Sequence, residues 1–213
     1  MFKRKPRSYS QIASDIVYPR GGWSRATRYL VHRLRRLPDE PSRIGRGVAA
    51  GVFISFTPLF GVHLLGGLAL AWLMRGNLIA AVLGSLVGNP VTIPFIAVMS
   101  VGLGRWMLGV PGSMSPGVIM AAFTAASGQL WHNFMSIFDG RVAEWDRLLA
   151  FFNGIFLPYL VGGLIPGLIA ATVFHYLTVP LVRTYHRRKL QRIARRHASA
   201  RPGTGGEDSG EGR

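Results

Sequence analysis

The sequence predicts an all-α, polytopic helical membrane protein whose helices are broken by proline and glycine, with a re-entrant hairpin as one alternative. Three long runs without a charged residue cover residues 47–74, 78–104 and 148–182. Each is long enough to cross a membrane, which takes about 20 apolar residues. Of the 25 Lys and Arg, 12 lie in residues 1–46 and 9 in residues 183–213. Because Lys and Arg beside apolar spans stay in the cytoplasm, we expect both termini there.

The net charge of +16 would by itself indicate a nucleic-acid partner. A soluble nucleic-acid binder would not carry long apolar runs between its basic ends, so we expect no nucleic acid. The basic ends would instead attract anionic lipid headgroups. The chain has no cysteine, which excludes disulfides, thiolate catalysis and Cys-ligated zinc. We find no phosphate-binding glycine loop, zinc helix or nucleophile elbow, so the sequence indicates no enzyme, no cofactor and no metal site.

The N-terminal part divides into two segments. Residues 1–22 are basic and rich in Pro, Ser and Gly, which predicts a flexible arm. In residues 23–37, apolar side chains recur at helical spacing and five arginines occupy the remaining surface. This pattern predicts an amphipathic helix that lies in the membrane interface, and a soluble helix packed on another domain is the alternative. Pro38 ends the helix.

Residues 39–182 form the predicted membrane domain. Its first run, residues 47–74, is too long for one straight span and too short for two, and Pro58 lies near its middle. The run is either a long kinked span or a re-entrant hairpin that turns at Thr57–Gly61. Residues 75–77 then form a tight turn.

The remaining segments follow in order. Residues 78–104 are broken in the middle by Gly88-Asn89-Pro90. Residues 116–138 are only moderately apolar and predict an amphipathic helix on the outer surface, with a fourth span as the alternative. Residues 183–213 form a basic cytoplasmic tail with a disordered end. The run 148–182 is interrupted by Pro158, Gly162, Gly163, Pro166 and Gly167.

Charge favours one topology. With both ends inside, the number of full crossings is even. A hairpin at residues 47–74 leaves Arg75 inside, so that 78–104 cross outward and 148–182 return. A full crossing by the first run would place Arg75 outside and would require one more crossing. We favour the hairpin because it keeps Arg75 on the cytoplasmic side.

The breaks carry the candidate site. Backbone groups freed inside lipid need a partner, and transporters use such breaks to build binding sites at the membrane midplane. The alternative is that proline and glycine only kink the helices and allow close packing. His63 is an ionisable group within a run, and Arg75 would pair with an anionic headgroup or substrate. The candidate residues for the polar site are Thr57, Pro58, His63, Arg75, Asn77, Asn89, Pro90 and Thr92.

Two functional hypotheses remain open. The first is a small transporter or lipid flippase-like protein for a small-molecule or lipid substrate. Two or three spans are few for a pathway, so copies in a homo-oligomer would complete the cavity. The second is a non-transporting membrane scaffold or lipid-binding protein whose basic cytoplasmic arms recruit partners.

Three motifs in fixed order resemble a known family. They are Gly51-Val-Phe-Ile-Ser-Phe-Thr-Pro58-Leu-Phe-Gly61, then Arg75-Gly-Asn77, and then Asn89-Pro90-Val-Thr92-Ile-Pro94. Together they resemble the bacterial membrane-protein family known as domain of unknown function 2062, over about residues 25–185. The resemblance implies a protein of the bacterial inner membrane. It implies no established activity, substrate or catalytic residue.

Overall fold

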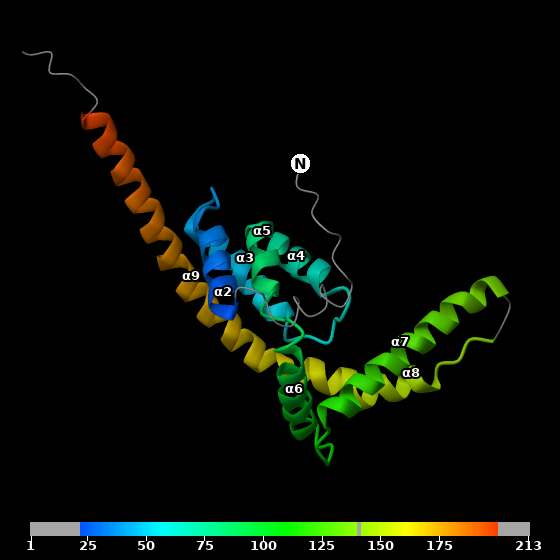
Figure 1. Cartoon of the computed structure of the whole chain (residues 1–213). Helices are drawn as coiled ribbons and strands as arrows, with labels where there is room; N and C mark the ends of the chain where they lie inside the picture. The colour runs from blue at the N-terminus through cyan, green and yellow to red at the C-terminus, as the bar shows by residue number, and fades with distance from the viewer. Residues whose placement is uncertain (1–21, 140–141, 200–213) are drawn as a thin grey trace, which may run out of the picture.

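The structure is a computed structural model that describes residues 22–139 and 142–199. Within these residues the chain forms helices and no strand (Figure 1), which confirms the all-α class. Most of the predicted flexible arm and the predicted disordered end of the tail lie outside the described residues. The helices are α2 (Gly22–Arg35), α3 (Pro41–Ile54), α4 (His63–Leu73), α5 (Leu78–Ser85), α6 (Ile93–Met107), α7 (Pro116–Asp139), α8 (Asp146–Phe151), the π-helix η1 (Phe152–Phe156) and α9 (Leu157–Ser199).

The first apolar run folds as a helical hairpin. Helices α3 and α4 pack against each other, and Ala50 of α3 is buried together with Ala71 of α4. Near the turn, Gly67 lies against Ile54, so the two helices run antiparallel. Of the two alternatives for residues 47–74, the chain therefore forms the returning hairpin and not one long kinked helix.

Helices α3 and α5 run parallel and pack through glycine. A Cβ atom on Gly51 would lie 2.1 Å from the carbonyl oxygen of Ala81, and one on Gly84 would lie 2.5 Å from that of Val48. Any larger residue at these positions would force the two helices apart. Arg75, in the turn between α4 and α5, has a left-handed φ of 52°.

Helix α9 packs on both α3 and α6 and is the longest element of the core. It is antiparallel to α3, because Gly45 lies against Val179 whereas Gly163 lies against Phe56. It is also antiparallel to α6, where a Cβ on Gly104 would lie 1.7 Å from the carbonyl oxygen of Pro158. Helix α3 covers the part of α9 toward its C-terminus, and α6 covers the part toward its N-terminus.

The prediction that proline and glycine interrupt residues 148–182 is wrong. Helix α8, the π-helix and α9 follow one another without a gap, and α9 continues through Pro166 and Pro180. The glycines of this run serve close packing instead. A Cβ on Gly162 would lie 2.0 Å from the carbonyl oxygen of Ser100, and one on Gly163 would lie 2.1 Å from that of Phe56.

The π-helix and Arg105 together explain how Pro158 fits inside this long helix. The Leu157 N–H donates to the Phe152 carbonyl, five residues back. Pro158 has no N–H, so it cannot bond to the Gly154 carbonyl, four residues before it. Arg105 of α6 supplies the missing donor, since its Nη1 lies 3.4 Å from the Gly154 oxygen.

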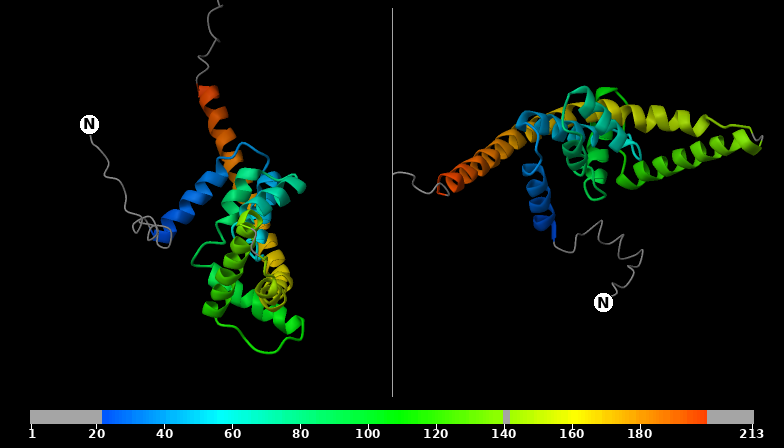
Figure 2. Two further views of the ribbon diagram at one scale, coloured as in Figure 1. Left: turned by 90° about the vertical axis from the view of Figure 1, so that its right-hand side faces the viewer. Right: turned by 90° about the horizontal axis from the view of Figure 1, so that it is seen from above.

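Helices α7 and α8 project from the core as a two-helix arm (Figures 1 and 2). A helix forms over the segment predicted at residues 116–138. Ile119 and Phe123 pack on the core, whereas Phe134 and Ile137 are exposed. The helix is too long for one face to stay against the core, so its second half packs only on the chain around α8.

One described helix, Asp146–Arg195, is long and apolar enough to cross a membrane by its length and composition. Of the expected polytopic arrangement, the structure therefore shows one candidate span. The other two apolar runs give no helix of that length because the breaks divide them. The runs 47–74 and 78–104 each divide into two helices, and those helices have 14, 11, 8 and 15 residues.

Candidate functional site at the helix breaks and the α2–α9 groove

The candidate residues fall into two groups at opposite ends of the α3–α4 hairpin. Thr57 and Pro58 lie in the loop between α3 and α4, and Asn89, Pro90 and Thr92 lie between α5 and α6. His63, half-buried, begins α4 beside the first loop. Arg75 and Asn77 lie between α4 and α5, at the other end. The structure therefore brings together most of the candidate site but separates this last pair from it.

The polar side chains of the first break bond to nearby backbone. Thr57 is buried, and its Oγ1 donates to the Ile54 carbonyl at 2.7 Å. That carbonyl is the one four residues before Pro58, which has no N–H to offer it. Ser55 Oγ donates to the Gly51 carbonyl at 3.0 Å. Both hydroxyls thus stabilise the end of α3.

The second break is stabilised in the same way. Asn89 Oδ1 accepts from the N–H of Val91 and from that of Thr92, at 2.9 and 3.1 Å, while Thr92 Oγ1 accepts from the Asn89 N–H at 3.0 Å. This reciprocal pair has the pattern of a capping box and closes the turn that leads into α6. Asn89 Nδ2 donates to the Leu86 carbonyl, four residues before Pro90, at 3.3 Å. Thr92 also donates to the Val87 carbonyl.

The two breaks lie side by side. A Cβ on Gly88 would lie 2.9 Å from Ser55 Oγ. Beyond them, an aromatic cluster joins the first break to the arm and to α9. Phe60 meets Phe123 edge-on with ring centroids 4.5 Å apart, and Tyr159 lies 6.0 Å from Phe60. The breaks therefore form the junction between the core and the arm.

At the other end of the hairpin, Asn77 is a cap. Its Oδ1 accepts from the Ala80 N–H at 2.7 Å at the start of α5, and its Nδ2 donates to Asp39 at 2.6 Å. Asp39 also pairs with Arg43 at 3.1 Å. The Arg75 side chain is exposed, while its backbone carbonyl accepts from Arg46 at 3.2 Å. In the described part of the chain, no group of three or more His, Asp or Glu residues could hold a metal ion.

An apolar groove of about 460 Å³ lies between α2, α5, the second break and α9. Asn89 and Thr92 lie on its wall and are among its few polar residues. The groove is lined by Thr27, Leu30, Val31, Leu34, Val48, Leu83, Gly84, Leu86, Val87, Asn89, Thr92, Phe174, Leu177, Thr178 and Leu181. Its volume is within the range of about 300–1,000 Å³ that is typical of small-molecule sites.

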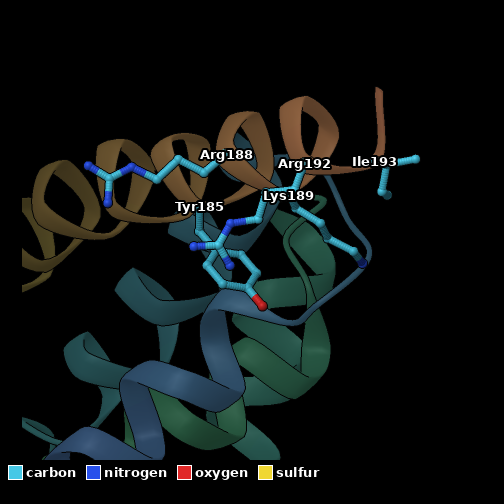
Figure 3. A pocket seen from close by; sticks show the side chains of 5 residues that line it. All are labelled: Tyr185, Arg188, Lys189, Arg192 and Ile193. Carbon is cyan, nitrogen blue, oxygen red and sulfur yellow. The ribbon is translucent and has the colours of Figure 1, made fainter. Parts of the chain in front are cut away.

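Basic hollows continue from this groove. Arg35 and Arg188 line a hollow of about 370 Å³ that shares Leu177 and Leu181 with the groove. Farther along α9, a hollow of about 400 Å³ is lined by Tyr185, Arg188, Lys189, Arg192 and Ile193, whose side chains Figure 3 shows. None of the residues that line these hollows or the groove is acidic.

Sequence reasoning assigned no role to Arg35, Arg188 or the leucines of the groove. The sequence showed that residues 23–37 and the tail are basic, but it did not show that their arginines meet at one site. Nothing in the sequence shows that α2 lies against a part of α9 about 150 positions later. The residues of the breaks were visible because proline with Asn or Thr is a local pattern.

Comparison with known proteins gives one match. No curated protein and no solved structure matches the chain. A family model described as "Uncharacterized protein conserved in bacteria (DUF2062)" matches residues 24–191, which include every helix that builds the breaks and the groove. This confirms the resemblance drawn from the three motifs, and the chain belongs to the DUF2062 family of uncharacterized bacterial proteins.

Proposed function

We propose that the protein is a multi-pass protein of the bacterial inner membrane that binds anionic lipid at its basic cytoplasmic end and catalyses no reaction. The observation that carries the proposal is the polarity of the arm. On α7 the polar side chains Gln129, Asn133 and Ser136 are buried, whereas Trp131 and Phe134 are exposed. This is the reverse of the arrangement expected in water.

The buried polar groups of the arm have partners inside it. Gln129 accepts from the Leu148 N–H at 2.7 Å and donates to Asp146 at 2.9 Å. Asn133 accepts from the Glu144 N–H at 3.0 Å and donates to the Glu144 carbonyl. A hydrocarbon solvent requires polar groups to bond to one another inside the structure. The apolar groups then face outward. Large exposed apolar patches likewise mark contact with membrane or protein.

The distribution of charge supports the orientation. Helix α2 and the C-terminal part of α9 carry most of the described Lys and Arg, and Arg75 lies toward the same end, in the turn between α4 and α5. Helices α5 and α6 lead away from that end to Arg105, and α9 returns. Two full crossings place both termini on one side, and the positive-inside rule assigns that side to the cytoplasm.

A small transporter or flippase, completed as a homo-oligomer, is the second candidate function. It is favoured by the adjacency of the two breaks, because broken helices meet at the binding sites of transporters. Lipid binding ranks first because the side chains of Thr57, Asn89 and Thr92 already bond to local backbone and thereby account for the breaks.

Cysteine accessibility tests the proposal, since the chain has no natural cysteine. Single substitutions Arg75→Cys, Thr92→Cys, Val110→Cys and Ile137→Cys are labelled in membrane vesicles of each orientation with water-soluble and lipid-soluble maleimides. We expect Arg75→Cys to react only from the cytoplasmic side and Val110→Cys only from the outside. Ile137→Cys should react only with the lipid-soluble reagent, because Ile137 is 75% exposed on the arm.

Three outcomes separate the alternatives. Reaction of Ile137→Cys with the water-soluble reagent would contradict placement of the arm in lipid. Reaction of Arg75→Cys from the outside would contradict the topology. Reaction of Thr92→Cys with the water-soluble reagent from both sides would favour transport over lipid binding alone, because it would show a water-accessible path at the breaks.

A further inference from the structure

We propose that the groove between α2 and α9 binds one anionic phospholipid, with an acyl chain in the groove and the phosphate on Arg35 and Arg188. This inference rests on the proposed membrane location and adds a specific ligand site to it. The groove and the hollow at the two arginines share Leu177 and Leu181. One apolar surface therefore leads directly to two guanidinium groups, as an amphiphilic ligand requires.

The groove fits a hydrocarbon chain. Leucine, valine and phenylalanine form most of its wall, with contributions from α2, α3, α5 and α9. The polar groups Asn89 and Thr92 bond to the break itself, so they do not demand a polar ligand. A bound acyl chain would cover this apolar surface, and burial of apolar surface favours binding.

The two arginines fit a phosphate. Arg35 Nε is buried and has no hydrogen-bond partner among the described residues. A buried donor left unpaired costs free energy, which a ligand oxygen would recover. The Arg188 side chain is exposed and lines the same hollow as Arg35. A guanidinium group binds phosphate through parallel N–H donors, so two arginines at one hollow suit a phosphate group.

Three other arginines differ from this pair, since their side chains bond within the protein. Arg46 also has a buried Nε without a partner among the described residues, but its Nη2 donates to the Arg75 carbonyl at 3.2 Å. Arg43 pairs with Asp39, and Arg105 donates to the carbonyls of Pro111, Gly112 and Gly154. Their hydrogen bonds explain them as structural residues. Arg35 has no such explanation, although it lines three of the hollows between or beside α2 and α9.

Charge makes a second copy of the chain a poorer occupant of the groove than an anionic lipid. A copy would bring a net charge of +16, with 9 acidic residues against 25 basic ones, to a surface that is itself basic. Like charges brought together at an interface disfavour association. An anionic lipid offers the opposite charge together with the hydrocarbon that the groove needs.

Native mass spectrometry of the purified full chain, delipidated in detergent, tests the site. The probes are dioleoylphosphatidylglycerol, dioleoylphosphatidylcholine and glycerol 3-phosphate. The site variant is Arg35→Gln with Arg188→Gln. The matched control is Arg33→Gln with Arg187→Gln, which removes the same charge from the same two helices at positions that line none of the hollows.

We expect one tightly bound phosphatidylglycerol, weaker phosphatidylcholine and no retained glycerol 3-phosphate. The site variant should bind phosphatidylglycerol about tenfold or more weakly than the control, since each lost cation lowers the affinity for an anionic headgroup. Val31→Trp, which fills the groove, should abolish binding, whereas Val173→Trp on the exposed face of α9 should not.

Equal losses in the site variant and its control would overturn the site, because they would show attraction by general surface charge. The proposed membrane location would survive that result, since vesicle labelling at Ile137 tests it separately. Retention of phosphatidylglycerol by Val31→Trp, with a changed oligomeric mass, would also overturn the inference and would identify a second copy as the occupant.

Discussion

The core and the arm bury opposite kinds of side chain. Where α3, α6 and α9 meet, the interior holds apolar residues and glycines that bring backbones together, and the hydroxyls of Ser100 and Tyr159 are buried there without a partner. In the outer part of the arm, the interior holds the amides of Gln129 and Asn133, and Trp131, Phe134 and Phe138 are exposed.

This difference shows that the two regions are stabilised by different forces. The core depends on close packing, so it tolerates little change in volume. The outer part of the arm has almost no apolar interior, and hydrogen bonds from α7 to the start of α8 and to Glu144 just before it hold it together. Such bonds are strongest where water is excluded. Water is excluded from the arm only if lipid covers its exposed aromatic side chains.

Gly104→Ala in the core should have the largest effect. The added Cβ would lie 1.7 Å from the Pro158 carbonyl oxygen, so α6 and α9 must move apart. We expect a loss of stability of about 3 kcal/mol or more, measured as thermal unfolding in detergent. Gly102→Ala on the same helix is the control, because a Cβ there meets nothing within 4 Å. Equal stability of the two variants would contradict the close packing of α6 on α9.

Phe134→Asp tests the outer surface of the arm. Phe134 is exposed, lies beside Trp131 and meets Phe138 edge-on. If lipid covers it, a carboxylate there should lower membrane insertion or stability by about 2.5 kcal/mol. If water covers it, the change should stay within about 0.5 kcal/mol. The measurement is the fraction of protein that resists extraction from membranes at alkaline pH, with Val142→Asp as a control that adds the same charge in the loop before α8.

The sequence predicts much of the core because its signals are local. Proline beside Thr57 and Asn89 marked both breaks, and the turn at residues 75–77 marked the hairpin. The run from 148 to 182 misled prediction because proline and glycine look alike whether they break a helix or pack one. Only the neighbours of Gly162 and Pro158, which are on α6, decide between the two.

The residues of the candidate site could be predicted from the sequence, but the role of their side chains could not. Polar side chains near prolines were expected to face a ligand, yet three carbonyls that lie four residues before a proline each accept from a side chain. The donors are Thr57, Asn89 and Arg105. The groove was not predictable at all, since it needs the position of α2 against α9. Its signal in the sequence was limited to the amphipathic pattern of residues 23–37.

Asn133→Leu should have the smallest effect on stability of the three substitutions. It tests the difference between the core and the arm most directly. A leucine of similar volume at a buried polar position in the core would be neutral or favourable. In the arm it removes both hydrogen bonds to Glu144 and should cost about 1.5 kcal/mol. Hydrogen exchange would then rise in the amides of α8 but not in those of α3. Thr124→Val, which removes only a bond within α7 to the Met120 carbonyl, is the control. Unchanged exchange in α8 would mean that lipid or packing, and not the buried amides, holds the arm closed.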